Sequence, residues 1–157
     1  MTDDDPFLSE LTRVLAGDEP LQGALGATVA KLGCDSGTLH LLGADGQLHL
    51  EAATAGLPEP VLATIRTIPV GKGMAGLAVE RAEPVTACNL QTDDSGDVRP
   101  GAKATGLQGA IVVPVLDARD RPVGSLGVAN RAERTFTAGE IALLTAVGRA
   151  IGARRES

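Results

Sequence analysis

Aromatic side chains are almost absent from this chain of 157 residues, which has two Phe, no Tyr and no Trp. This scarcity argues against a binding site built on an aromatic cage or on stacked bases. Cations are also outnumbered, because 20 Asp and Glu face 14 Lys and Arg and leave a net charge of −6. A chain with this charge lacks the basic surface that nucleic acid requires, so we expect no nucleic-acid partner.

Long apolar runs, a signal peptide and paired cysteines are missing as well. The longest uncharged stretch, 104–116, contains Gly and Pro and is too short to cross a membrane. The segment 1–6 is acidic where a secretion signal carries cations. Cys34 and Cys88 lie far apart, without a CxxC motif, which fits neither a disulfide framework nor a zinc site. We therefore expect a cytoplasmic protein with no metal, no cofactor and no membrane contact.

What is present is a succession of helical and extended patterns. Apolar spacing predicts helices over 6–15, 20–32, 59–66 and 74–81, and a last helix that begins at Thr137. Period-two patterns predict strands over 34–42, 48–54, 84–88, 109–116 and 123–130. Hairpins with helices at both ends are typical of an α+β domain with a mainly antiparallel sheet. We expect an N-terminal helix in 1–19, available for a dimer contact, and the main domain in 20–157.

The first hairpin sets the expected faces of its two strands. Asp45 and Gly46 form the turn, since Asp-Gly between extended runs is a strong hairpin signal. Strict alternation then places Leu48, Leu50 and Ala52 together on one face of the second strand.

The glycines of Gly71-x-Gly73-x-x-Gly76 match the dinucleotide fingerprint literally. Their context argues against that function, because no series of βα units is present and no acidic residue ends the next strand. Two interpretations then stay open. The N–H groups of Gly73, Met74 and Ala75 could hold an anionic ligand group at a helix N-terminus, or the glycines only shape a packed turn.

Two further residues carry candidate chemistry. Cys88 could serve as a redox-active or attachment cysteine, but a lone cysteine at a strand end also fits a small core residue. His40 is expected on the same strand face as Thr38, and both a ligand contact and a hydrogen-bonded core histidine are open for it.

Several segments in order resemble a GAF domain, the small-molecule-sensing module of bacterial signalling proteins. They are 34–42 with its Asp-Gly hairpin, 68–76, 109–115, 123–130 and 136–144. The resemblance implies a five- or six-stranded antiparallel sheet, with the terminal helices on one face, where they often dimerise, and pocket loops on the other. It also implies a set of ligand-binding residues: Thr38, His40, Val70, Gly73, Met74, Ala75, Cys88, Gln108 and Val112.

The chain can also be compared with the known kinds of GAF domain, each of which has its own sequence signature. The signature of cyclic-nucleotide binders is matched only in part, because Ile141 follows Glu140 where an acidic residue should stand. Bilin-binding members use a Cys-His pair, whereas Cys34 is followed by Asp and Cys88 by Asn. Haem-binding members need a His near the pocket helices, and neither His40 nor His49 is expected there.

These observations predict a stand-alone, non-catalytic sensor of the bacterial signalling type. With few aromatic residues, its pocket should take a small or anionic ligand instead of a cyclic nucleotide. The expected partners are an unidentified small molecule, a second copy bound through the terminal helices, and a histidine kinase or transcription regulator in trans. Two alternatives stay open: an enzyme like the free methionine sulfoxide reductases that uses Cys88, and a ligand-free dimerisation module.

Overall fold

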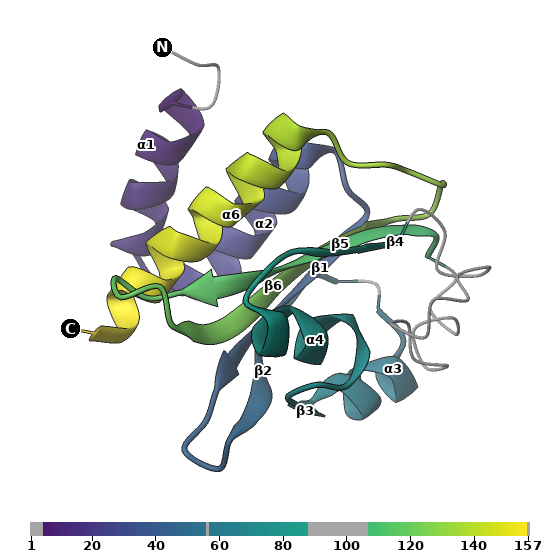
Figure 1. The fold of residues 1–157 in the computed structure, drawn as a ribbon. Helices are drawn as coiled ribbons and strands as arrows, with labels where there is room; N and C mark the ends of the chain where they lie inside the picture. Colours follow the sequence, from purple (N-terminus) through teal and green to yellow (C-terminus); the bar gives the residue numbers. More distant parts are fainter. Residues whose placement is uncertain (1–4, 56, 88–106, 157) are drawn as a thin grey trace.

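A single six-stranded sheet divides the molecule into two helical layers, as a computed structural model shows for residues 5–55, 57–87 and 107–156 (Figure 1). The helices are α1 (Asp5–Leu15), α2 (Pro20–Leu32), α3 (Glu59–Ile65), α4 (Gly73–Arg81) and α6 (Ala138–Gly152), followed by the short 3-10 helix Ala153–Glu156. The strands are β1 (Ser36–Leu42), β2 (Gln47–Ala53), β3 (Thr67–Pro69), β4 (Val85–Ala87), β5 (Gly109–Leu116) and β6 (Pro122–Asn130). The predicted α+β class and the antiparallel sheet are confirmed.

All neighbouring strands in the sheet run antiparallel, in the order β3-β2-β1-β6-β5-β4. The predicted strands account for five of these positions. The sixth, β3, is a strand of three residues that pairs with β2 at the edge of the sheet. Such a short segment is too brief to show a period of two, and its Pro69 suits an edge position.

The larger hydrophobic core lies between the sheet and the layer formed by α1, α2 and α6 (Figure 1). Leu25 from α2, Leu39 from β1, Ile111 from β5 and Leu144 from α6 are all completely buried in it. Helix α6 lies very close to β5, because a Cβ atom at Gly148 would be only 3.2 Å from the carbonyl oxygen of Pro114. The terminal helices therefore cover one face of the sheet, as predicted.

Local signals set the helix boundaries that the sequence predicts. Thr137 and Glu140 form a complete capping box: the Glu140 amide donates to Thr137 Oγ1 at 3.1 Å, and the Thr137 amide donates to Glu140 Oε1 at 2.9 Å. Gly33 ends α2 with a φ of +66°, in the left-handed region where glycine is favoured.

The register between β1 and β2 differs from the prediction. Leu39 pairs with Ala52 but His40 pairs with Leu50, so the pairing shifts by one residue at this point. Ala52 belongs to the core under the terminal helices, whereas Leu48 packs on the opposite face with Ile68. The prediction that Leu48 and Ala52 share one face is therefore wrong, because a bulge reverses the alternation within β2.

Helices α3 and α4 cover the other face of the sheet (Figure 1). Met74 and Ala78 of α4 pack against Val85 of β4 and Ala110 of β5 in a smaller core cluster. Among the residues described, no helix is long and apolar enough to cross a membrane, and no group of three or more His, Cys, Asp or Glu could hold a metal ion.

Candidate functional site

A cavity of about 420 Å³ lies between the sheet and the layer of α3 and α4. The three central strands β1, β5 and β6 form its floor, and the two helices with the segments before them form its walls. The lining residues are Ser36, Gly37, Thr38, His40, Leu57, Val61, Thr64, Ile65, Ile68, Lys72, Gly73, Met74, Ala75, Leu107, Ala110, Val112, Gly127, Val128 and Ala129. Its volume lies within the range usual for small-molecule sites.

Most of the predicted ligand-binding residues lie together around this cavity. Those that line it are Thr38, His40, Gly73, Met74, Ala75 and Val112. Val70 lies outside the lining, and its side chain is 38% exposed just after the edge strand β3. Gln108 also lies outside, just before β5, where its backbone N–H donates to the backbone carbonyl of Asn130 at 2.7 Å. Cys88 falls outside the described residues.

Other lining residues were missed by the sequence reasoning. Ala110 shares the face of Val112 through the period of two along β5, so alternation could have found it. Ala129 of β6 pairs with Ala110, so its position depends on the register between the two strands. Val61 and Ile65 come from α3, whose position over the sheet no local pattern reveals.

His40 is the most deeply buried polar group of the cavity wall, with 2% of its surface exposed. Its Nε2 lies 2.8 Å from the carbonyl oxygen of Ile65. Because a carbonyl only accepts, Nε2 carries the proton and donates it. Burial lowers the pKa of His40 below its ordinary value, the Ile65 hydrogen bond acts against this shift, and His49 adds to it. The ring is therefore neutral at neutral pH, with a free lone pair on Nδ1.

Nδ1 of His40 has no hydrogen-bond partner in the described part of the chain and is itself buried. A buried acceptor without a partner costs about 1–3 kcal/mol, so such atoms are uncommon in folded proteins. Of the two interpretations open for His40, the hydrogen bond of a core histidine is present at Nε2, and the ligand contact stays a prediction. Nε2 is hydrogen-bonded to Ile65, and Nδ1 has no hydrogen-bond partner among the described residues.

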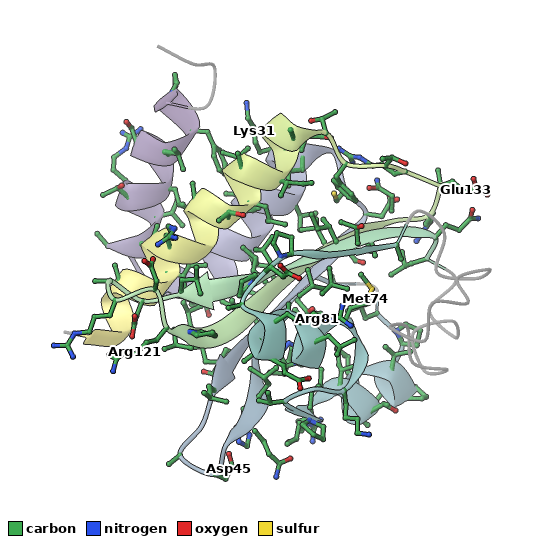
Figure 2. The ribbon with its side chains drawn as sticks, viewed as in Figure 1. Lys31, Asp45, Met74, Arg81, Arg121 and Glu133 are labelled. Atoms are coloured by element: carbon green, nitrogen blue, oxygen red, sulfur yellow. The ribbon has the colours of Figure 1, made fainter. Side chains whose placement is uncertain are left out.

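The N-terminus of α4 opens on the same cavity. The amides of Gly73, Met74 and Ala75 precede the first α-helical hydrogen bond, in which Gly76 N donates to Lys72 O at 3.1 Å. Among the residues that the structure describes, no side chain caps this helix end. Unpaired N–H groups and the helix dipole favour an anion at this position. Figure 2 shows Met74 extending from α4 toward the sheet.

Lys72 adds a positive charge at the mouth of the cavity. Its exposed side chain is among the lining residues, immediately before α4. It forms no ion pair with another residue of the described ranges, 5–55, 57–87 and 107–156. The helix N-terminus and this ammonium group would therefore both attract an anion.

The glycines of the turn before α4 are required by the backbone. Gly71 and Gly73 have φ angles of +90° and +65°, and Gly71 N donates to Gly76 O at 2.9 Å. A Cβ atom at Gly76 would lie 2.4 Å from the carbonyl oxygen of Pro69. The turn follows an edge strand of an antiparallel sheet, which excludes the parallel βαβ context of a dinucleotide fingerprint.

Cys34 lies away from the cavity and packs against the core under the terminal helices. Arg134 Nη1 donates to its Sγ over 3.5 Å. Burial raises the pKa of the Cys34 thiol, and the nearby Arg134 opposes that shift. A half-buried thiol with a raised pKa is a poor nucleophile at neutral pH.

The fold and cavity together define a class: an α+β domain in which one antiparallel sheet separates a ligand-sized pocket from a layer of terminal helices. The model of the GAF domain family matches residues 18–154. The chain therefore belongs to the GAF domain family. A comparison with proteins of curated function gave no match.

Solved structures are similar to the chain over nearly its full length. The GAF domain of a phosphoenolpyruvate-protein phosphotransferase from Coxiella burnetii has a TM-score of 0.79 at 21% identity, covering 96% of this chain and 91% of that one. Free methionine-R-sulfoxide reductase from Neisseria meningitidis, solved with its substrate, has a TM-score of 0.73 at 20% identity, covering 96% and 89%. The nlh2 GAF domain of A. aeolicus has a TM-score of 0.73 at 15% identity, covering 95% and 93%. At these identities the likeness shows the fold alone.

Proposed function

We propose that the chain is a non-catalytic sensor domain of bacterial signal transduction that binds a small molecule in the cavity between the sheet and α3 and α4. The observation that carries this proposal is the cavity itself, which has a volume of about 420 Å³ and is lined by His40 of β1 on one side and by the first turn of α4 on another.

The lining supports a small aliphatic or anionic ligand instead of a cyclic nucleotide. Its residues are mainly aliphatic, such as Val61, Ile68 and Val112, and none of the lining residues in the described ranges is Phe, Tyr or Trp. Both Phe lie elsewhere, since Phe7 and Phe136 pack in the core under the terminal helices. A purine ring would therefore find no aromatic side chain here on which to stack. The open cavity also favours a ligand over a module whose pocket is filled by its own side chains.

The strands offer a direct mechanical connection between ligand and output. Val112 lines the cavity, whereas its neighbours Ile111 and Val113 pack under the terminal helices. Helix α6 lies directly against β5, because Gly148 has no side chain to keep the two apart. A ligand that binds better to one position of β5 would therefore also favour the position of α6 that goes with it. We propose that a second copy of the chain, or a histidine kinase or transcription regulator in trans, responds to the terminal helices.

Native mass spectrometry of freshly purified protein tests the proposed function. We expect one small molecule retained per chain, and a complex of two chains of 15.9 kDa each. The retained mass identifies the ligand, and denaturing spectra of the same sample show that it is not covalently attached. A strict monomer at high protein concentration contradicts the dimer. A cavity that stays empty after purification and after a screen of small acids contradicts the sensor.

One alternative is an enzyme that resembles the free methionine-R-sulfoxide reductases. The likeness of the fold to the Neisseria meningitidis reductase favours it, together with the presence of Cys88 in the sequence. Thiol-dependent reduction of free methionine-R-sulfoxide, measured for the unmodified chain and for Cys88→Ser, distinguishes it from the sensor. We expect no turnover in either protein. Turnover that is lost in Cys88→Ser would establish the enzyme.

A further inference from the structure

We propose that the cavity recognises its ligand through the hydroxyl groups of Ser36 and Thr38 on β1, which donate hydrogen bonds to an uncharged oxygen atom of the ligand. The chemical class is an aliphatic molecule that carries a carbonyl group or another neutral oxygen acceptor. This inference rests on the proposed function, since it names what the same cavity binds.

Both side chains point to the cavity, because their neighbours on β1 point the other way. A Cβ atom at Gly37 would lie 2.9 Å from Leu25 Cδ1, and Leu39 is completely buried in the core under the terminal helices. Successive side chains of a strand alternate between the two faces of the sheet, and β1 pairs with β6 in regular register over this stretch. Ser36 and Thr38 therefore face the layer of α3 and α4, where both line the cavity.

Neither hydroxyl group has a partner within the described part of the chain. Ser36 is only 7% exposed, yet neither its Oγ nor Thr38 Oγ1 forms a hydrogen bond with another described residue. Among the buried side-chain polar atoms of these residues, only Nδ1 of His40 is both unpartnered and closed off. The unpartnered Ser36 oxygen is therefore open to the cavity. A hydroxyl group that loses water on folding without gaining a partner costs free energy, which an acceptor on a ligand would recover.

The Thr38 hydroxyl is reached across Gly127 of β6. Thr38 pairs with Gly127, which in turn pairs with Val112 of β5, so the three residues form one row across the cavity floor. A Cβ atom at Gly127 would lie 3.7 Å from Thr38 Oγ1 and 3.1 Å from Val112 Cγ2. Because glycine has no side chain, a carbon atom of the ligand fits between the hydroxyl group and the methyl group, with its oxygen directed to Thr38.

The charges of the lining decide that this oxygen is uncharged. The lining formed by the described residues contains no Arg, and its one Lys, Lys72, precedes α4 at the mouth of the cavity. A carboxylate beside the buried Ser36 would lose its hydration without gaining a paired cation. The opposite wall is aliphatic, with Val61 and Ile65 from α3 and Met74 from α4, so it stabilises the apolar body of the ligand.

Thermal unfolding of the ligand-free protein, prepared by unfolding and refolding, tests whether the hydroxyl groups are unpartnered. We expect Ser36→Ala and Thr38→Val each to raise Tm by about 3 °C, because each removes a polar group that has no hydrogen bond to lose. The matched control is Thr28→Val, since Thr28 is buried in α2 and its Oγ1 donates to the Ala24 carbonyl at 2.7 Å. This control should lower Tm. A decrease of Tm in the two cavity variants, like that of the control, would overturn the proposal.

Two probes test the hydrogen bonds in the cavity: 4-methyl-2-pentanone, an uncharged aliphatic ketone, and xenon, which fills apolar space without hydrogen bonding. Each is titrated into ¹⁵N-labelled protein. We expect the double variant of Ser36→Ala and Thr38→Val to bind the ketone about tenfold more weakly and xenon at least as tightly as the unmodified chain. Thr28→Val should leave the ketone affinity unchanged. Equal loss of both probes in the double variant, or no loss of ketone binding, overturns the proposal.

Infrared spectroscopy of the ketone bound to the unmodified chain needs no variant. A hydrogen bond weakens the C=O bond, so we expect a lower stretching frequency than in an alkane solvent. An unshifted frequency overturns the hydrogen bond, whether or not the variants fold. If native mass spectrometry finds a retained molecule without an uncharged oxygen, this inference fails while the proposed function stands. If neither probe binds and nothing is retained, both fail.

Discussion

Replacing Gly76 by Ala is expected to lower the free energy of unfolding by about 2–3 kcal/mol, a large effect for one methyl group. The new Cβ would lie 2.4 Å from the Pro69 carbonyl oxygen and 3.0 Å from Gly71 N. Both are backbone atoms, so neither can rotate away as a side chain can. The turn must move off α4, and this movement breaks the hydrogen bond from Gly71 N to Gly76 O and shifts the first turn of the helix. Chemical denaturation measures the change.

Gly26→Ala is the matched control for this prediction. Gly26 lies within α2, and a Cβ atom there would meet nothing within 4 Å. Ala favours a helix over Gly by about 1 kcal/mol, so the same chemical change should raise stability here. Opposite signs at the two positions would establish close backbone contact as the cause. A stabilised or neutral Gly76→Ala would contradict the tight turn before α4.

Val112→Phe is expected to weaken ligand binding by about 100-fold while changing the free energy of unfolding by less than about 1.5 kcal/mol. Val112 points into the cavity, which has room for the additional ring atoms. The ring therefore occupies the ligand's space without pressing on packed neighbours. Binding of the molecule retained in native mass spectrometry, together with denaturation curves, measures both quantities.

The adjacent residue provides the control. Val113 is completely buried on the opposite face of β5, within the core under the terminal helices. Val113→Phe must force additional atoms into a filled space, which typically costs about 1–3 kcal/mol. If Val112→Phe destabilises the chain as much as Val113→Phe does, the cavity is not the open space that the proposed function requires.

Much of the fold could be predicted because its signals are local. The start of α6 follows from Thr137 and Glu140, because the side chain of each accepts a hydrogen bond from the backbone N–H of the other within a single turn. The end of α2 follows from Gly33, which adopts a backbone conformation that other residues avoid. Residues that determine structure through such near neighbours are visible in the sequence without knowledge of the fold.

The faces of β2 could not be predicted in the same way. The bulge that separates Leu48 from Ala52 depends on how β2 meets β1, and a period-two pattern assumes that no residue is inserted. The candidate site was predicted only in part for a similar reason. Val61 and Ile65 reach the cavity because α3 lies over the sheet, which is a tertiary contact. The unpartnered Nδ1 of His40 depends on the same helix, since the Ile65 carbonyl accepts the ring's N–H from Nε2 and so leaves Nδ1 without a proton.

The alternation along β5 has a consequence for how such a domain can diversify. Ala110 and Val112 face the cavity, while Ile111 and Val113 face the core that contributes most of the packing. Under the proposed function, substitutions at Val112 are expected to change what the cavity binds, whereas those on the second pair are expected to change the stability of the fold. Under the proposed function, ligand preference can therefore change through single substitutions in the cavity while the core under the terminal helices stays intact. Descendants that sense unrelated molecules would still share the same backbone.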